Sequence, residues 1–377
     1  MTRGRVNEGH VRKGRVSEGQ VRKGRVSRGQ VRRGSVLNPK GGRLHGWGGV
    51  TAMAAACALT AAATMIPLAL SGGSGDGTPS AGQRVAQAAP ARSTPGKAAP
   101  GKAESCTDPE ASLTPSGADG PTIDRIKKAG HLVVGVDQNS YRWGYRDPAN
   151  DRLDGFDIAL VRAIAKNILG SEDKVTYRAI PTNQRIEALQ ENKVDIVVRT
   201  MTINCERVRQ VAFSTAYFQA GQQVLAPKGS TITGYNDTLN GKKVCTATGS
   251  TAYDALKAKS YGAVFADTPT EQRTVPNQLD CLVKLQLGLV DAVVTDNALA
   301  AGQAAQDPAV DLKGGPFTTE YYGVATKLGN DDLVRRINQV LVDYRSGGAE
   351  SPWMKAYRKW LSADLKGITG PPAPKYR

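Results

Sequence analysis

From about residue 123 onward, two hydrophobic periods alternate along the chain. Short apolar runs such as LVVGVD at 132–137 are typical of buried strands, whereas the apolar residues of 156–169 are spaced to share one helix face. The following segments continue this alternation in two successive series. The predicted strands are 132–137, 175–180, 194–200, 242–248, 263–267 and 290–296, and the predicted helices are 156–169, 183–193, 250–259, 277–288 and 297–305.

This order of strands and helices predicts an α/β fold with two lobes, each a parallel sheet covered by helices. Open parallel sheets bind ligands beyond the carboxyl ends of their strands. In this chain the rule selects Asp137, Arg199 with Thr200, the turn at 246–251, and Asp296. The predicted site therefore combines cationic and anionic side chains.

The segments before this body have three different compositions. Residues 1–35 repeat a ten-residue unit that begins GRV and has no buried face, which predicts a disordered basic tail over 1–43. Residues 48–70 are apolar throughout and long enough to span a membrane, so 44–70 is predicted to be a signal or transmembrane anchor. Residues 71–122 are rich in Gly, Pro, Ala and Ser and predict a flexible linker.

The sequence leaves more than one role open for each of the basic tail and the apolar run. Basic residues before the apolar run would remain in the cytoplasm, and the rest of the chain would lie outside. Ala69-Leu70-Ser71 resembles a cleavage site, an uncleaved anchor fits equally well, and Cys57 offers a weaker lipidation signal. The basic tail is either a docking arm for anionic membranes or proteins, or a solvated segment or misassigned start.

The formal net charge of +16 suggests nucleic-acid binding, but its location argues against that function. Residues 1–43 contain 13 Lys or Arg and two Glu, and the net charge of 106–377 is only +3. Among three histidines, only His131 lies in the body, at the edge of a predicted strand. A His-rich metal site is therefore excluded, as is a Ser-His-Asp triad unless His131 is its base. We expect no nucleic acid, metal or cofactor.

Four cysteines follow the apolar run, in a compartment where disulfides persist. Cys245 ends a predicted strand and Cys281 lies in a predicted helix of the same segment, so we expect these two to pair. That leaves Cys106 to pair with Cys205, which would attach the end of the linker to the body. The alternative is a set of free buried thiols.

Three features at the strand ends match the head group of a free amino acid. Gly249-Ser250-Thr251 begins a helix, where free N–H groups and the helix dipole favour a carboxylate. Arg207 could bind both carboxylate oxygens, and Asp296 could pair with an ammonium group. Each feature also has an ordinary interpretation, namely a helix N-cap for Ser250 or Asp296 and a surface salt bridge for Arg207. Their combination favours a zwitterionic ligand.

Six segments in a characteristic order connect the chain to a known family: LVVGVD at 132–137, GFDIALVRAIA at 155–165, RIEALQENKVDIVV at 185–198, MTINCERVRQVAFSTAYFQAGQQVLAPK at 201–228, GKKVCTATGSTA at 241–252 and GLVDAVVTDNALAAG at 288–302. Through them, residues 124–365 resemble the amino-acid-binding (family 3) extracytoplasmic solute receptors of ABC importers. The resemblance implies a type II periplasmic-binding-protein fold, whose two lobes are joined by a two-strand hinge. The implied boundaries are crossings near 222–227 and 319–324, lobe 1 at 123–221 and 322–368, lobe 2 at 222–321, and a C-terminal tail at 369–377.

The resemblance also implies roles for individual residues. Arg207 would bind the α-carboxylate of the ligand, with help from Thr202 and Thr200. Ser250 and Thr251 would contact the same carboxylate from the second lobe.

Asp296 would bind the α-ammonium group of the ligand. Tyr141 would stack on the ligand from the loop after the first strand, and Asp137 in that loop would join the site.

Selectivity for the ligand side chain would depend on two arginines. Arg185 matches a position that meets the distal carboxylate in glutamate and aspartate receptors, and Arg199 ends a buried strand and adds a second cation. Two cations in a partly dry cleft favour a dicarboxylate over glutamine. The alternative is that Arg199 pairs with Asp195 or Glu206.

The cysteine pattern and tail resemble those of glutamate-binding receptors of high-GC Gram-positive bacteria. We therefore expect a monomeric, extracytoplasmic receptor, anchored through 48–70 or secreted, that closes on glutamate, or else on aspartate or glutamine. It would deliver the amino acid to an ABC permease with its ATPase. Two alternatives are a membrane-anchored sensor of amino acids and a dehydratase-like enzyme on the same fold.

Overall fold

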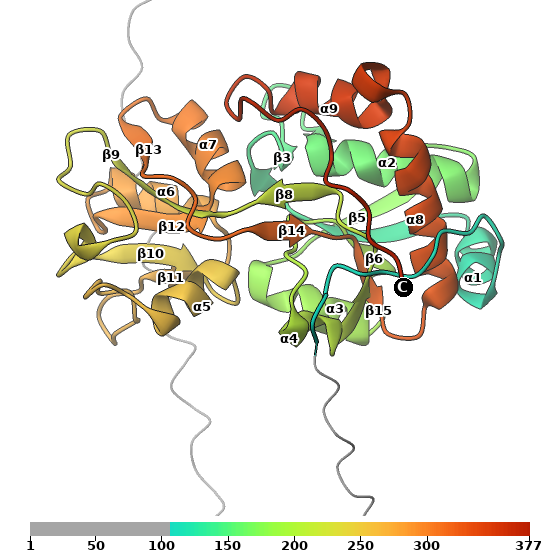
Figure 1. Ribbon diagram of the computed structural model, residues 1–377, viewed down its shortest axis with the longest axis horizontal. Helices are drawn as coiled ribbons and strands as arrows, with labels where there is room; N and C mark the ends of the chain where they lie inside the picture. The colour runs from blue at the N-terminus through green and yellow to red at the C-terminus, as the bar shows by residue number, and fades with distance from the viewer. Residues whose placement is uncertain (1–105) are drawn as a thin grey trace, which may run out of the picture. The chain divides into compact units, whose positions relative to one another are not determined.

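The computed structural model describes residues 106–377, which form two lobes connected by a pair of strands (Figure 1). The strands of lobe 1 are β1 (Leu132–Val136), β5 (Val175–Ala179), β6 (Ile196–Val197), β7 (Val211–Phe213) and β15 (Ala325–Lys327). They form a sheet in the order β5-β1-β6-β15-β7. β1 is parallel to β5 and β6, whereas β15 is antiparallel to β6 and β7.

Helices cover both faces of this sheet, because β6 exposes apolar side chains alternately to the two sides. Ile196 packs against the helices of one face and Val197 against those of the other. The helices on the Ile196 side are α1 (Pro121–Ala129), α2 (Phe156–Leu169), α8 (Asp331–Arg345) and α9 (Pro352–Trp360), preceded by η3 (Gly348–Glu350). The Val197 side carries η1 (Thr182–Gln184), α3 (Arg185–Gln190) and the short α4 (Cys205–Val208). A small sheet of β2 (Asn139–Ser140), β3 (Gly144–Arg146) and β4 (Leu153–Asp154) follows β1.

Lobe 2 repeats this arrangement. Its strands are β9 (Gln222–Pro227), β10 (Val244–Ala247), β11 (Thr274–Val275), β12 (Ala292–Asp296) and β13 (Val310–Lys313), in the order β11-β10-β12-β9-β13. Its helices are η2 (Asp237–Leu239), α5 (Thr251–Ala258), α6 (Leu279–Gln286) and α7 (Asn297–Gln306). Two apolar clusters fill the lobe, one beneath α5 and one that includes residues of α6 and α7.

The chain passes between the lobes on two antiparallel strands, β8 (Phe218–Ala220) and β14 (Glu320–Tyr322). Figure 1 shows these strands side by side between the two larger sheets. The first crossing therefore lies earlier than the predicted 222–227, since that segment is β9 within the lobe 2 sheet. The predicted second crossing, 319–324, contains β14.

The structure corrects two further predictions about the sheets. Both sheets are mixed rather than parallel, because the strands next to the crossings, β9 and β15, run antiparallel to their neighbours. Residues 263–267 form only one bridge, between Lys243 and Val264, and the edge position beside β10 belongs to β11. The apolar pattern of 263–267 instead reflects side chains that pack onto the α5 cluster.

The predicted linker ends earlier than residue 122. The Ser112 side chain is buried, its N–H donates to Lys375 O at 3.0 Å, and its carbonyl accepts from Arg377 N at 2.8 Å. The C-terminal tail and residues 106–112 thus lie together on lobe 1. The basic repeat, the apolar run with Cys57, and the linker up to residue 105 lie outside the described residues. Among the helices of 106–377, none combines the length and hydrophobicity that crossing a bilayer requires.

Candidate functional site

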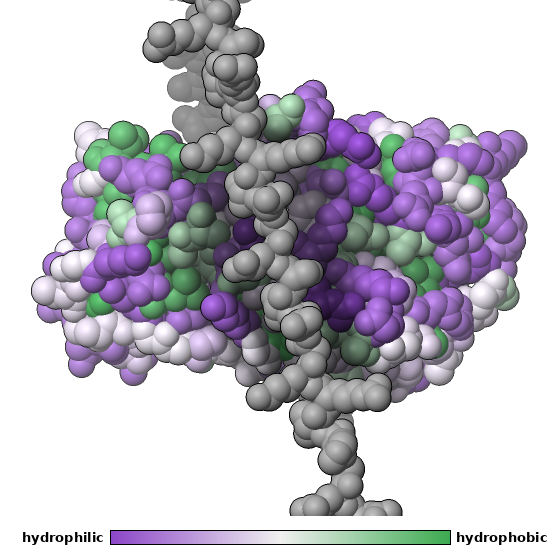
Figure 2. All heavy atoms as spheres, turned by 90° about the horizontal axis from the view of Figure 1, so that it is seen from above, coloured by the Kyte–Doolittle hydropathy of each residue, from purple (hydrophilic) through white to green (hydrophobic). Residues whose placement is uncertain are grey.

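A small cavity lies between the two lobes, where the carboxyl ends of β1, β6 and β12 face the beginning of α5. Its volume is about 30 Å³, enough for only a few water molecules. Figure 2 shows mostly hydrophilic side chains along the hollow in the middle of one face, where the grey trace leaves it visible. Nine of the ten predicted site residues line the cavity: Asp137, Arg185, Arg199, Thr200, Thr202, Arg207, Ser250, Thr251 and Asp296.

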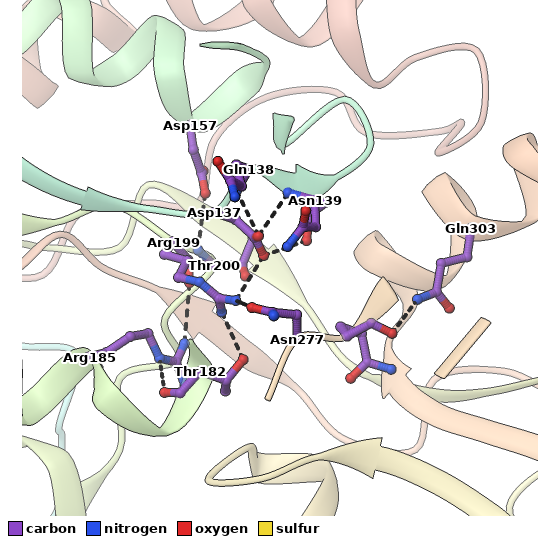
Figure 3. Close-up of polar contacts among 12 residues, drawn as sticks. Asp137, Gln138, Asn139, Asp157, Thr182, Arg185, Arg199, Thr200, Asn277 and Gln303 are labelled. Carbon is purple, nitrogen blue, oxygen red and sulfur yellow. Dashed lines mark hydrogen bonds and ion pairs between the residues drawn. The ribbon is translucent and has the colours of Figure 1, made fainter. Parts of the chain in front are cut away.

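Arg199 already has an acidic partner in this cavity. Its Nη2 lies 3.0 Å from Asp137 Oδ2, and both side chains are buried (Figure 3). Nη1 donates to Thr182 Oγ1 at 2.8 Å, and Nη2 also reaches Asn277 Oδ1 of lobe 2 at 3.4 Å. The predicted alternative pairing with Asp195 or Glu206 is wrong, because the pair forms with Asp137. The Arg199 charge is therefore largely neutralised within the protein.

Thr200, the residue after Arg199, has a strained backbone. Its φ of 41° is in the left-handed region, which β-branched residues rarely adopt. Asp157 Oδ2 accepts from Thr200 N at 3.0 Å, and Asp157 Oδ1 accepts from Tyr217 Oη at 2.8 Å. Burial raises the pKa of Asp157 to about 7, although these two hydrogen bonds oppose the shift. The strain thus lies where the backbone meets the cavity.

Arg185 is a buried cation with backbone partners. Nε donates to Thr182 O at 2.8 Å and Nη1 donates to Arg199 O at 3.2 Å, as Figure 3 shows. No carboxylate of residues 106–377 forms an ion pair with it. Burial, together with the nearby charges of Arg207 and Arg199, lowers the Arg185 pKa well below its ordinary value. The guanidinium is thus a cation in the cavity wall that an anion would stabilise.

Arg207 is positioned by α4, the shortest α-helix among the described residues. The Asn204 side chain caps α4 by accepting from Arg207 N at 2.9 Å. Arg207 Nη1 donates to Thr202 O at 2.8 Å, and Nη2 crosses to Gly249 O of lobe 2 at 3.2 Å. Burial lowers the Arg207 pKa, and the charge of Glu320 opposes this. The surface salt bridge considered for this arginine is wrong, because the side chain is buried and has no acid partner among the described residues.

Asp296 lies at the end of β12 and faces Tyr322 of the crossing strand β14 and Gln222 at the start of β9. Tyr322 Oη and Gln222 Nε2 donate to its two oxygens, and its side chain does not cap α7. Burial raises the Asp296 pKa to about 7, and the charge of Glu320 contributes in the same direction. The alternative of an ordinary capping aspartate is therefore wrong.

Ser250 and Thr251 begin α5 on the lobe 2 side of the cavity. Ser250 Oγ accepts from Tyr253 N at 3.2 Å, so the serine is a helix N-cap as well as a cavity residue. The turn before it approaches lobe 1 closely, since a Cβ on Gly249 would lie 3.1 Å from Asn183 Cα. The N-terminus of α5 therefore presents its dipole to the cavity.

Glu320, in β14, is the important neighbour that the sequence prediction missed. Its Oε2 accepts from Thr202 Oγ1 at 2.5 Å and from Thr251 Oγ1 at 2.9 Å, one hydroxyl from each lobe. Its Oε1 accepts from Gln222 Nε2 at 2.9 Å. The available signal was a single acid within a predicted hinge segment, TTEYYG, where a buried charge needs partners. The polar residues that line the cavity itself and were not predicted are Thr182, Gln278 and Thr295.

Tyr141 does not line this cavity. It borders a smaller neighbouring cavity of about 10 Å³, together with residues of lobe 2 such as Gln303. Its ring packs edge-on against Tyr145, with a centroid distance of 5.2 Å. Nearby, Trp143 Nε1 donates to Ala298 O of lobe 2 at 3.1 Å, so this loop helps to hold the lobes together.

Both predicted disulfides are present, Cys106–Cys205 and Cys245–Cys281. Within residues 106–377 no three His, Cys, Asp or Glu side chains gather in a way that could hold a metal ion. The site is thus a polar pocket with a helix N-terminus, the buried carboxylates of Asp296 and Glu320, and two guanidinium groups that have no acid partner among the described residues. This set can bind a small zwitterion by hydrogen bonds and charge.

Several known proteins are similar to this chain. The pattern of the bacterial extracellular solute-binding proteins, family 3, matches residues 132–363. The glutamine-binding protein of an ABC transporter from Bacillus subtilis is 35% identical over 243 residues, which cover 64% of this chain and 85% of that protein. The L-glutamate/L-aspartate-binding protein of Pseudomonas aeruginosa is 27% identical, with coverages of 66% and 82%.

Two solved structures are also similar. An ancestral arginine-binding protein bound to glutamine is 37% identical with a TM-score of 0.55, covering 62% of this chain and 98% of that one. The solute receptor for L-cysteine of Neisseria gonorrhoeae is 28% identical with a TM-score of 0.59, and the coverages are 65% and 96%.

Proposed function

The chain belongs to family 3 of the bacterial extracellular solute-binding proteins, and from that premise we propose that it captures an acidic amino acid, glutamate in preference to glutamine. It is an extracytoplasmic amino-acid-binding receptor for ABC transport. The observation that carries the choice of ligand is the pair of buried guanidinium groups, Arg185 and Arg207, that have no acid partner among residues 106–377. Two unpaired cations match two carboxylates better than one carboxylate and an amide.

Arg207 and the N-terminus of α5 hold the α-carboxylate in this proposal, and Asp296 accepts the α-ammonium group. Arg185 binds the distal carboxylate of the side chain. Arg199 contributes less to the ligand charge, because Asp137 already neutralises it. Selectivity for the side chain therefore depends on Arg185 alone rather than on the two arginines that the sequence suggested.

In the proposed mechanism, a hinge motion of the two lobes gives the amino acid its route into the site. A cavity of about 30 Å³ is much smaller than the several hundred Å³ that small-molecule sites usually offer. Its walls come from both lobes, which are joined by β8 and β14. We propose that the lobes separate to admit the amino acid and close when it bridges Arg207 and α5, since only the closed form makes both sets of contacts.

Calorimetry of the full chain against the twenty amino acids tests this function. We expect glutamate to bind more tightly than glutamine, and the Arg185→Met variant to lose about tenfold or more in glutamate affinity while its glutamine affinity stays unchanged, since only the acid loses a charge partner. Arg178→Met, an exposed arginine on β5, is the matched control and should bind like the wild type. If the wild type bound glutamine as tightly as glutamate, the assignment of Arg185 would be refuted.

The affinity should also depend on pH through Asp296. Its pKa of about 7 is set by burial and by the groups that face it, namely Glu320, Tyr322, Gln222 and Arg185. An ammonium group favours the ionised carboxylate, so binding releases a proton below about pH 7. We expect the dissociation constant to rise as the pH falls from 7 to 5, approaching tenfold per pH unit, because one proton is linked to binding.

Proton release can be measured directly, from the dependence of the binding heat on the ionisation heat of the buffer. The Asp296→Asn variant should release no proton over this range. Asp157 has a similar raised pKa, so Asp157→Asn is the control and should keep the wild-type slope. A flat pH profile for the wild type between pH 5 and 7 would show that Asp296 does not bind the ammonium group.

A further inference from the structure

The disulfide between Cys106 and Cys205 lies next to the arginine that holds the α-carboxylate. Cys205 is the first residue of α4, and Arg207 is two residues further along the same helix. The bond joins this helix to Cys106, at the beginning of the described chain. The position of Arg207 therefore depends on a helix that is covalently attached to a distant segment.

α4 has little stability of its own. It contains four residues, Cys205–Val208, which is about one turn, and helices this short do not persist in water without tertiary contacts. Its polar anchors include the Asn204 cap and the Arg207 hydrogen bonds to Thr202 O and Gly249 O, and Val208 is the one residue of the helix that packs against the apolar cluster of lobe 1. One of these bonds crosses to lobe 2 and is lost when the lobes separate. In the open form, fewer hydrogen bonds hold α4 in place, so the disulfide contributes more to its position.

The segment at the other end of the bond is itself firmly attached to lobe 1. Ser112 Oγ donates to Phe213 O at 2.7 Å and accepts from Asn338 Nδ2 at 2.9 Å. Lys375 Nζ lies 2.9 Å from Asp108 Oδ1 and 3.2 Å from Glu110 Oε2. The disulfide therefore connects α4 to a fixed part of the lobe rather than to a loose end.

The two disulfides differ in their access to solvent. Cys245 and Cys281 are 0% exposed in the core of lobe 2. Cys106 and Cys205 are half-buried, and Cys106 borders a surface groove of about 810 Å³. Because thiol–disulfide exchange requires a thiolate to reach a sulfur atom, a mild reductant should open the first bond and leave the second intact.

We propose that the Cys106–Cys205 disulfide positions Arg207, and that amino-acid capture depends on the oxidation state of this bond. The inference rests on the proposed function, in which Arg207 binds the α-carboxylate. A dithiol reductant transfers two electrons and two protons to the bond, which becomes two thiols while the reductant closes to its own disulfide. The reduced α4 then samples more conformations, and the ligand must order it again on binding.

The first experiment uses the full chain with low concentrations of dithiothreitol, thiol alkylation and mass spectrometry of the peptides. We expect alkylation at Cys106 and Cys205 and none at Cys245 and Cys281. Under these conditions the dissociation constant for glutamate should rise about tenfold, within the range that coupling between sites usually spans. A reduced protein that binds within twofold of the oxidised one would overturn the inference.

The double variant Cys106→Ser/Cys205→Ser removes the bond without a reductant. It should show the same tenfold weaker binding and no further response to dithiothreitol. If this variant does not fold, the reduced wild type, with its melting temperature followed in parallel, provides the same comparison. If dithiothreitol weakens the binding of this variant further, the redox effect belongs to another site.

Reduction of the Arg207→Lys variant tests whether the disulfide positions Arg207 or only stabilises lobe 1 in general. If the disulfide acts through Arg207, reduction should change the affinity of this variant less than threefold, because the two effects are not additive. An undiminished tenfold loss would show that the bond only supports the lobe. The proposed function fails separately, namely if the oxidised wild type binds no amino acid.

Discussion

Replacing Arg207 by Ala is expected to raise the dissociation constant for the amino acid about a thousandfold, and replacing it by Lys about a hundredfold. Arg207 uses two of its five N–H donors on Thr202 O and Gly249 O, which leaves the others for a carboxylate. The site is buried, so a carboxylate without this partner loses its water and gains nothing in return. Lysine restores the charge but not the planar pair of donors.

Isothermal titration calorimetry measures this loss. Arg209, which follows α4 and is exposed, is the matched control, and Arg209→Ala should bind within twofold of the wild type. The hydrogen bond from Arg207 to Gly249 also links the lobes, so Arg207→Ala should shift the free protein toward more open forms in small-angle scattering. Unchanged affinity in Arg207→Ala would refute the role of this residue in carboxylate binding.

Asp296→Asn is expected to weaken binding about a hundredfold at pH 8, because the ammonium group of the ligand would lose its charged partner within a buried site. The asparagine can still accept from Tyr322 Oη, so the loss should report charge rather than shape. Asp311→Asn, on the exposed side of β13, removes the same unit of charge and should have no effect.

The same substitution should stabilise the ligand-free protein at alkaline pH. The folded-state pKa of Asp296 is about 7 and lies above its unfolded value, so this carboxyl group binds more protons in the folded than in the unfolded state between about pH 4 and 7. The contribution of Asp296 to stability therefore falls as the pH rises through that window, and Asp296→Asn removes this pH-dependent loss. Thermal melting of both proteins at pH 5 and pH 8 checks the sign: the difference in melting temperature should be larger at pH 8.

The sequence predicted nine of the residues that line the cavity, because the positions of most of them follow from the ends of strands. Asp137, Thr200 and Asp296 each come after or end an apolar run, and a strand that is buried on both faces leaves its end at the edge of the sheet. Arg207 and Ser250 could be placed in the same way, relative to helix starts. Local patterns of this kind determine where the backbone of a site residue lies in the fold.

Local patterns do not determine which partner a side chain chooses. Arg199 had several acids within reach along the sequence, and its pairing with Asp137 depends on how β1 and β6 align in the sheet. The contacts of Glu320 depend on the arrangement of both lobes, since its carboxylate accepts from Thr202 of lobe 1 and from Thr251 of lobe 2. The strand expected at 263–267 failed for a similar reason, because another segment occupies the edge beside β10.

The contacts between residue 112 and residues 375–377 have a practical consequence for building a sensor from this protein. Both ends of the described chain belong to lobe 1, so reporters fused to the two ends would move as one unit and give no signal when the lobes separate. One reporter must instead be inserted into lobe 2. The turn at 228–230 is suitable, because Lys228 and Gly229 are exposed and β9 on its N-terminal side continues directly from the crossing strand β8.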